Sequence, residues 1–280
     1  MILIADSGST KTHWLLLKPD NRTASYYTKG LNPYFAGEDI FKKVLENDLK
    51  INKNEISQLH FYGSGCGTDS AVFFVENNLQ KYFPSAKIDV YSDLFGAARA
   101  LFGHGSGIAC ILGTGSVSCV YDGKKITDRV PSLGYILGDE GGGAALGKEL
   151  LRAYFYKRLP EHIHHAFESN YAISREEVLE KIYHKPSPNA YLASFSKFLR
   201  TNFRDPYIHD LVYRCFKNFF TDHVAVYPNF KKLPLAFTGS VSSNLKEILE
   251  EVAGEFGTTV SKIMKEPMDG LVAFHKGIEI

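Results

Sequence analysis

The sequence predicts a two-lobed α/β protein in which a βββαβα unit occurs twice. The chain has 280 residues, enough for a large core and two lobes. An apolar strand, a small-residue turn and a second apolar strand open the chain in ILIADSGSTKTHWLLL (2–17). The same pattern returns in LGTGSVSCVYDGKKI (112–126), where the order of expected elements begins again. The repetition is one of topology, with little sequence identity between the halves.

The first half is expected to hold three short strands followed by alternating helices and strands. Over 38–50, apolar residues recur on one helical face, namely Ile40, Phe41, Val44, Leu45 and Leu49. Asp69 is expected to cap the helix that follows it. The expected elements are strands 1–6, 13–17 and 23–28, helix 38–50, strand 58–64, helix 70–82, strand 87–93 and helix 94–102. The turn-rich GHGSG (103–107) then predicts a hinge.

The second half repeats this order with a larger helical insert. The expected elements are strands 107–112, 116–121 and 124–129, helical segments 143–159, 174–184, 190–201 and 208–227, a strand that runs into a turn over 233–240, helix 244–255, strand 258–262 and helix 269–276. The N-terminal lobe is therefore expected to comprise 1–106 with a closing helix in 269–280, and the C-terminal lobe 107–268.

The composition is that of an ordinary globular protein and argues against several classes. Hydrophobic residues make up 44%, charged residues 22%, and the net charge of +1 does not favour a polyanion such as nucleic acid. No apolar run approaches the roughly 20 residues that span a bilayer, and no signal peptide is recognisable. A cytoplasmic protein is expected. The cysteines, spaced for neither a zinc site nor a disulfide framework, are expected to be buried thiols: Cys66, Cys110, Cys119 and Cys215.

Both small-residue turns have a composition that suits phosphate binding. Small residues let backbone N–H groups approach a phosphate, and hydroxyls add donors. Asp6 ends the first strand beside the turn 7–11, and a carboxylate there would need Mg²⁺ between itself and a phosphate. The second turn, 113–116, has neither an acid nor a lysine. Neither turn is a Walker P-loop, and alone each is more typical of an ordinary hairpin.

Two further glycine-containing segments and one acid complete the pattern. LGYILGDEGGGAALG (133–147) has six glycines around an Asp-Glu pair and then enters a helix. FTGSVSSN (237–244) connects a strand to a helix, as an ordinary βα loop would. Asp93, in VYSDLFGAARAL, lies where a strand ends and a helix begins. That position suits a helix N-cap, and it also suits a general base, since α/β folds place chemistry at strand C-termini.

In combination, these motifs resemble the sugar kinase, Hsp70 and actin superfamily of ATP-using proteins. Within it, the chain resembles the BadF/BadG/BcrA/BcrD ATPase family, and among its members most of all the N-acetylglucosamine kinases. The resemblance covers essentially the whole chain and rests on DSGSTKT (6–12), LGTGS (112–116), GYILGDEGGGAALG (134–147) and TGSV (238–241). It implies an actin-like ATPase (ribonuclease H-like) fold, in which the two hairpins hold one nucleotide's phosphates from both sides of a cleft.

The resemblance also implies the residues that contact the sugar and the metal. Asp93 matches the base that takes the proton of the sugar's 6-hydroxyl. Asn32, in GLNPY, matches an asparagine that contacts the sugar, and Asp139 matches a carboxylate that binds sugar hydroxyls. Asp6 would lie near Mg²⁺.

The resemblance implies ATP as the nucleotide and assigns its contacts to both turns. The phosphates would be lined by Gly8, Ser9, Thr10, Lys11, Gly113, Thr114 and Gly115. Thr114 and Gly115 would also hold the sugar's reacting end. Gly239 and Ser240 would lie against the nucleoside.

Two departures from the family pattern leave the sugar open. Tyr135-Ile136 replaces a Trp-Gly pair, and Gly142 stands where Ser is usual. The expected activity is ATP-dependent phosphorylation of the 6-hydroxyl of an N-acetylated hexosamine, with N-acetylglucosamine as the first choice. N-acetylmuramic acid and glucosamine stay open.

Two other function classes are weaker fits. One is an ATPase that activates a redox partner through an iron–sulfur cluster shared by two subunits; that class has a cysteine where this chain has GDEGGG (138–143). The other is a non-catalytic sugar sensor, which Asp93 and both turns argue against. The Tyr/Phe-rich stretch 191–230 is expected to form a helical core and leaves room for a homodimer surface.

Overall fold

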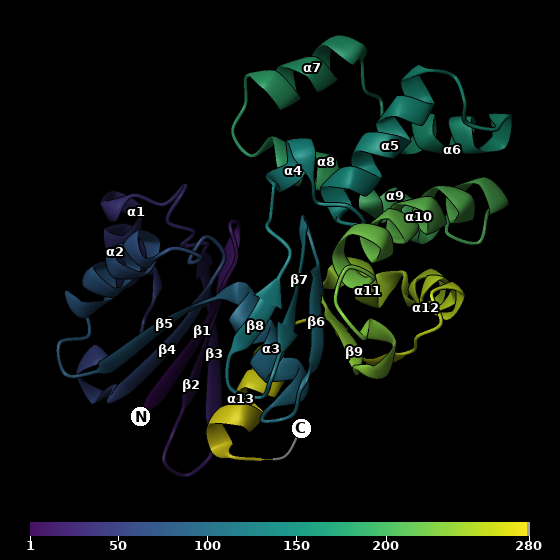
Figure 1. Cartoon of the computed structure of the whole chain (residues 1–280). Coiled ribbons are helices and arrows are strands. Elements are labelled where there is room, and N and C mark those ends of the chain that lie inside the picture. Colours follow the sequence, from purple (N-terminus) through teal and green to yellow (C-terminus); the bar gives the residue numbers. More distant parts are fainter. Residues whose placement is uncertain (279–280) are drawn as a thin grey trace. The chain divides into compact units, whose positions relative to one another are not determined.

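The computed structural model describes residues 1–278, which form two compact units. Unit 1 comprises Met1–Gly105, the short segment Gly123–Lys125 and, of the described C-terminal residues, 267–278. Unit 2 comprises Ser106–Asp122 and Ile126–Glu266. Figure 1 traces the chain through unit 1 in purple and blue, through unit 2 from teal through green to yellow near its end, and back into unit 1, also in yellow.

Unit 1 is built on a five-stranded mixed sheet in the order β3-β2-β1-β4-β5. Its strands are β1 (Ile2–Ser7), β2 (Lys11–Leu17), β3 (Thr23–Lys29), β4 (Gln58–Gly63) and β5 (Lys87–Ser92). The first three form an antiparallel meander, while β4 runs parallel to β1, and β5 runs parallel to β4. The register aligns Ser7 with Gly63 and Gly63 with Ser92, so β1, β4 and β5 end together at one edge of the sheet.

Helices pack against both faces of this sheet. They are α1 (Glu38–Lys43), the π-turn η1 (Val44–Asp48), the 3₁₀ turn η2 (Lys53–Glu55), α2 (Asp69–Gln80), α3 (Asp93–Phe102) and α13 (Met268–Lys276). Leu3 and Ala5 of β1 share a core with buried residues of α1 and α2. Tyr62 of β4 points the other way and reaches His275 of α13, as expected for neighbours in a strand whose side chains alternate.

The expected cap of α2 is wrong by one residue. Thr68 is the N-cap, because its hydroxyl oxygen accepts a hydrogen bond from Ala71 N at 3.3 Å. Asp69 is the first helical residue, where a carboxylate is still favoured by the helix dipole.

Unit 2 repeats the sheet topology in the order β10-β9-β6-β7-β8. Its strands are β6 (Gly107–Leu112), β7 (Ser116–Tyr121), β8 (Ile126–Arg129), β9 (Leu235–Thr238) and β10 (Val260–Met264). Again three antiparallel strands are followed by two that run parallel to the first. The duplicated βββαβα architecture expected from the sequence is confirmed.

The helices of unit 2 pack with its sheet into a hydrophobic core that is larger than the core of unit 1. They are α4 (Gly134–Leu137), α5 (Gly143–Phe155), α6 (Glu161–Asn170), α7 (Arg175–Tyr183), α8 (Pro188–Ser194), α9 (Ser196–Thr201), α10 (Pro206–Phe219), the π-turn η3 (Phe220–Val224), the 3₁₀ turn η4 (Phe230–Lys232), α11 (Ser240–Asn244) and α12 (Lys246–Glu255). Helix α10 buries one stripe, because Ile208, Leu211, Val212, Cys215, Phe216 and Phe219 recur at helical spacing. Helix α6 was not expected, since only Ile163 and Phe167 of its ten residues are buried.

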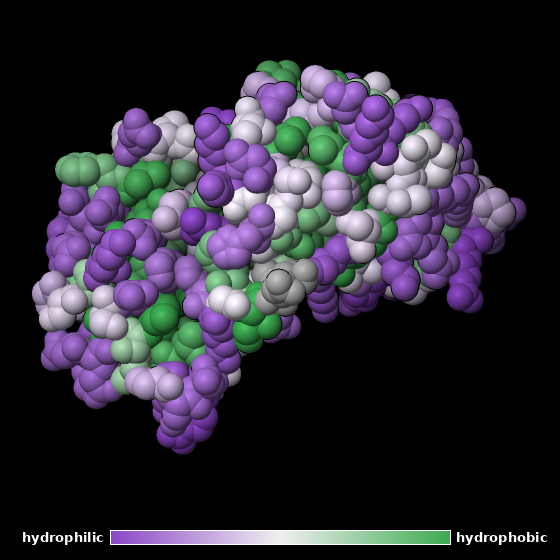
Figure 2. All heavy atoms as spheres, turned by 60° about the horizontal axis from the view of Figure 1, so that its bottom comes forward, coloured by the Kyte–Doolittle hydropathy of each residue, from purple (hydrophilic) through white to green (hydrophobic). Residues whose placement is uncertain are grey.

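The face of the molecule drawn in Figure 2 is mostly polar. In Figure 2, hydrophilic side chains cover most of the face shown, and hydrophobic ones gather in smaller patches between them. Within residues 1–278, none of the helices combines the length and the apolar character that crossing a membrane requires. All four cysteines are buried free thiols, as expected.

Candidate active site

The first turn is a tight, exposed hairpin. It is closed by Gly8 N, which donates to Lys11 O at 2.9 Å, and the side chains of Ser9, Thr10 and Lys11 are exposed. The turn rests on Gly30, whose N–H donates to Thr10 O at 3.0 Å. A Cβ at Gly30 would lie only 2.3 Å from Gly8 O, so only glycine allows this approach. The tip therefore presents two hydroxyls and an ammonium group on a fixed backbone.

Asn32 links this turn to the ends of the parallel strands. The side chain is 5% exposed, and its Nδ2 donates to Ser9 Oγ at 2.9 Å and to Ser64 Oγ at 3.4 Å. Its Oδ1 accepts from Tyr34 N at 3.0 Å, which fixes the amide's orientation. A residue predicted to contact sugar thus joins a residue predicted to contact phosphate.

Asp93 is the first residue of α3 and is not its N-cap. Ser92 has that role, because its hydroxyl oxygen accepts from Phe95 N at 3.2 Å. The Asp93 carboxylate accepts a hydrogen bond from Leu94 N at 2.8 Å and another from the Ser64 hydroxyl. Burial raises the pKa of Asp93 above its ordinary value, and these hydrogen bonds oppose the rise. A half-buried carboxylate with a raised pKa is a stronger proton acceptor than an exposed one.

Ser64 lies among the predicted site residues, although the sequence analysis did not name it. It follows β4 directly, and its N–H donates to Ser7 O at 2.8 Å. Its hydroxyl group bonds with both Asn32 and Asp93. A signal was available: Ser64 and Asp93 each follow a parallel strand, and such strands end at the same edge of a sheet.

Asp6 is placed where a single carboxylate could serve a metal bound to phosphate. It lies near the end of β1, half-buried, one residue before the buried Ser7–Thr12 hydroxyl pair, whose oxygens are 2.8 Å apart. Among residues 1–278, no group of three or more His, Cys, Asp or Glu side chains is arranged to hold a metal. Mg²⁺ commonly binds through one or two carboxylates together with substrate phosphates and water, so the residues present fit it.

The second turn is fixed by the start of helix α5. Gly143 N donates to Gly113 O at 2.8 Å, and Ala144 N donates to Thr114 O at 2.8 Å. A Cβ at Gly142 would lie 2.7 Å from the backbone carbon of Gly115. The glycine that replaces the family's usual serine at 142 therefore lies in close backbone contact with the turn.

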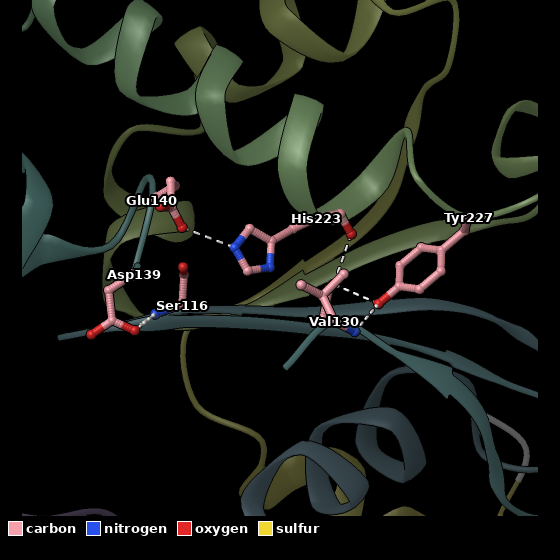
Figure 3. A network of polar contacts seen from close by, with 7 residues as sticks. Ser116, Val130, Asp139, Glu140, His223 and Tyr227 are labelled. Atoms are coloured by element: carbon pink, nitrogen blue, oxygen red, sulfur yellow. Dashed lines mark hydrogen bonds and ion pairs between the residues drawn. The ribbon is translucent and has the colours of Figure 1, made fainter. Parts of the chain in front are cut away.

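Asp139 lies directly against this second turn. Its Oδ1 accepts from Ser116 N at 3.1 Å, and a Cβ at Gly115 would lie 2.6 Å from the same oxygen. In Figure 3 the other carboxylate oxygen points away from Ser116. Burial raises the pKa of Asp139, while the Ser116 N–H opposes the rise.

The fourth small-residue segment contains a glycine that no other residue could replace without strain. Gly239 has φ +122°, and a Cβ there would lie 2.2 Å from Leu112 O at the end of β6. Ser240 starts α11 and lines a cavity of about 220 Å³ with Lys197, Arg200 and Asn244. The predicted nucleoside segment thus borders a polar hollow of unit 2.

The predicted site residues fall into two groups. In unit 1, Ser9, Asn32 and Asp93 are joined through Ser64, whereas the ammonium group of Lys11 lies 5.2 Å from the ring centre of Tyr27. In unit 2, contacts link the segments that contain Gly113, Thr114, Gly115, Asp139 and Gly239.

This architecture is that of the actin-like ATPase class, to which the sugar kinases belong. No protein-family model and no curated protein matches the sequence. A solved structure from Porphyromonas gingivalis, provisionally named N-acetylglucosamine kinase, is 38% identical with a TM-score of 0.94, over 99% of each chain. The chain belongs to the same family of sugar kinases, and the family resemblance drawn from the motifs is confirmed.

Two more distant structures share the fold. A Chromobacterium violaceum protein with the same provisional name is 17% identical, with a TM-score of 0.74 over 98% of each chain. A ROK family glucokinase from Streptomyces griseus, solved with glucose and AMPPNP, is 13% identical, with a TM-score of 0.58 over 99% of each chain.

Proposed function

We propose that this protein transfers the γ-phosphoryl group of ATP to the 6-hydroxyl of an N-acetylated hexosamine, with N-acetylglucosamine as the preferred acceptor. The observation that carries the proposal is the Asp93–Ser64–Asn32 arrangement at the ends of the parallel strands. The name of the P. gingivalis relative supports the choice of sugar.

Asp93 is the proposed general base. A sugar hydroxyl is a weak nucleophile, and a carboxylate that accepts its proton as the new P–O bond forms lowers the barrier. The hydrogen bonds from Leu94 N and Ser64 fix the carboxylate, so that the rotamer is set before substrate arrives. Because Ser92 caps the helix, Asp93 is available for this chemistry.

The other residues are proposed to position substrates and to balance charge, which is most of what phosphoryl transfer requires. Asn32 and Asp139 would hold sugar hydroxyls, together with Thr114 and Gly115. The two turns would donate hydrogen bonds to the phosphates. Gly239 and Ser240 would lie against the nucleoside.

Mg²⁺ is the proposed metal. Asp6 would hold it together with the nucleotide phosphates, where it would neutralise charge that develops during transfer.

The cysteines do not favour the redox-activating ATPase as an alternative. Cluster ligation needs thiolates. Cys66, the one cysteine in a turn, is buried, and burial raises its pKa to about 12. A kinase for another amino sugar is the remaining alternative, since Tyr135 and Gly142 depart from the family pattern.

The test is a coupled assay of ATP consumption with N-acetylglucosamine, N-acetylmuramic acid, glucosamine and glucose, followed by NMR of the product. We expect the largest kcat/KM with N-acetylglucosamine, and phosphate on its 6-oxygen. Phosphorylation at another hydroxyl, or no turnover with any of these sugars, would contradict the proposal.

A further inference from the structure

A buried polar network joins the Asp139 loop to a distant helix of unit 2. His223, only 5% exposed, lies in the π-turn η3, and its Nε2 is 3.0 Å from Glu140 Oε2 (Figure 3). The two residues are 83 positions apart in the chain. The motif that contains Asp139 is therefore tied, through its neighbour Glu140, to a segment that none of the sequence motifs includes.

The His223 end of this network is anchored to the sheet. The Ser118 hydroxyl donates to His223 O at 2.7 Å and pairs with the Tyr227 hydroxyl at 2.7 Å. Tyr227 in turn accepts from Val130 N at 3.1 Å. The His223 ring stacks on Phe219, with ring centres 4.9 Å apart and planes 10° apart. These contacts hold the imidazole in place independently of Glu140.

The Glu140 end lies in a backbone segment that needs such an anchor. Asp139 and Gly141, on either side of Glu140, both have positive φ, at 63° and 70°. Aspartate tolerates the left-handed conformation better than most residues other than glycine, and neighbouring contacts stabilise it further. Gly142 N donates to Asp139 O at 2.9 Å, which closes a turn around Glu140. Within the described chain, the side-chain contact that holds the middle of this turn is the one between Glu140 and His223.

We propose that His223 is a positioning residue for sugar binding. By holding Glu140, it fixes the turn 139–142 and so keeps Asp139 against Ser116 with one carboxylate oxygen directed away from the hairpin. This inference rests on the proposed role of Asp139 as a sugar ligand. On this proposal, His223 increases the affinity for sugar without contacting the sugar itself.

The test compares wild type with Glu140→Ala, Glu140→Gln and His223→Phe. Both Glu140→Ala and His223→Phe remove the hydrogen bond between Glu140 and His223. His223→Phe keeps an aromatic ring stacked on Phe219, and Glu140→Ala leaves the aromatic core unchanged. A folding defect in one variant would therefore not be expected in the other. His209→Ala is the matched control, because it removes a similar histidine–carboxylate pair, 2.9 Å from Glu251, at a more exposed position.

Two quantities are measured for each variant. One is hydrogen exchange at the amides of Gly142, Gly143 and Ala144, whose bonds fix the loop. The other is the set of KM and kcat values for sugar and ATP. Glu140→Ala and His223→Phe should speed exchange at these amides and raise the sugar KM about tenfold, with the ATP KM changed less than about twofold. Glu140→Gln should retain most of the wild-type behaviour, because an amide oxygen can still accept from Nε2.

Unchanged exchange in both variants would overturn the positioning role, whichever sugar the enzyme uses. Faster exchange with an unchanged sugar KM would overturn the link to sugar binding. A fall in thermal stability alone, matched by His209→Ala, would also overturn it. If wild type itself phosphorylates no sugar, the proposed function fails, and the exchange data still decide whether His223 fixes the loop.

Discussion

The two small-residue turns occupy equivalent places in the two units and are built in different ways. The turn after β1 is closed by backbone hydrogen bonds and is also held by a side chain: Asn32 bonds to Ser9, and the tip carries exposed hydroxyls beside Asp6 and Lys11. The turn after β6 is held by backbone: its carbonyl oxygens accept the first N–H groups of α5. Both hairpins therefore keep the same topology and both have backbone hydrogen bonds, whereas the segments that pack against them differ: the Asn32 segment against the first, the start of α5 and Asp139 against the second.

The difference indicates a division of labour. The first turn carries a lysine and two hydroxyls beside Asp6, a composition that suits a metal and a phosphate. The second turn is packed closely against Gly142 and the Asp139 carboxylate, so it can hold a ligand only through groups already fixed in place. Preorganised groups of this kind cost little reorganisation during catalysis.

Asp93→Asn should have the largest effect. Asparagine keeps the size and much of the hydrogen bonding but cannot accept the proton, so kcat should fall by about 10²–10⁴-fold. Thermal stability should hold, because Ser92 remains as the cap. Kinetics of the purified variant with N-acetylglucosamine and ATP measure the loss.

Asp69→Asn is the matched control for Asp93→Asn. Asp69 is likewise the first residue of a helix behind a hydroxyl cap, here Thr68. It should retain wild-type kcat. Equal activity of Asp93→Asn and wild type would remove the catalytic assignment.

Asp6→Asn should have the next largest effect. It tests whether the first turn depends on a carboxylate and a metal, a feature that the sequence of the second turn lacks. Losing the carboxylate should weaken Mg²⁺ binding and lower kcat/KM by roughly 10²-fold at ordinary Mg²⁺ concentrations. Raising the metal concentration should recover part of the activity. An activity–Mg²⁺ titration checks this, and full activity of wild type in excess chelator would contradict a metal role.

Gly115→Ala and Gly8→Ala should show that the second turn is packed more tightly than the first. A Cβ at Gly115 would lie 2.6 Å from the Asp139 carboxylate, so the substitution should lower the free energy of unfolding by about 1–3 kcal/mol. A Cβ at Gly8 would lie 3.6 Å from Lys11 O, an ordinary contact, so stability should change by less than about 1 kcal/mol. Urea unfolding measures both; equal losses would mean that the two turns are packed alike.

The sequence predicted the fold well because its signals are local. The short apolar strands, the helical spacing in α10 and the small-residue turns can all be read within a few residues. The irregular ends were harder: the helix expected over 38–50 changes to a π-turn at Val44, and the one expected over 208–227 does so at Phe220. These changes depend on tertiary packing, which local periodicity does not contain.

The site was predictable only where a motif marks it. Asp93, Asn32 and Asp139 were predicted as site residues because they lie in recognisable segments. Ser64 and His223 act through contacts with residues 29 and 83 positions away, respectively, and these contacts exist only once the strands and helices are in register. Ser64 was the more accessible of the two, since the alignment of parallel strand ends predicts its place beside Asp93.

Ser64→Ala should have the smallest effect, and it tests how the base in unit 1 is tuned. Burial raises the pKa of Asp93, and the Ser64 hydrogen bond opposes that rise, so removing the hydroxyl should raise the pKa further. Catalysis needs the deprotonated base, so the acid limb of the kcat/KM profile should move to higher pH, with only a few-fold loss at its plateau.

The pH dependence of stability gives an independent check on the pKa of Asp93. The folded state holds the Asp93 proton to higher pH than the unfolded state, so this carboxyl lowers stability as pH rises from the unfolded pKa through the folded one. That loss should extend to higher pH in Ser64→Ala and disappear in Asp93→Asn. An acid limb that stays at the wild-type pH in Ser64→Ala would mean that Ser64 does not tune the base.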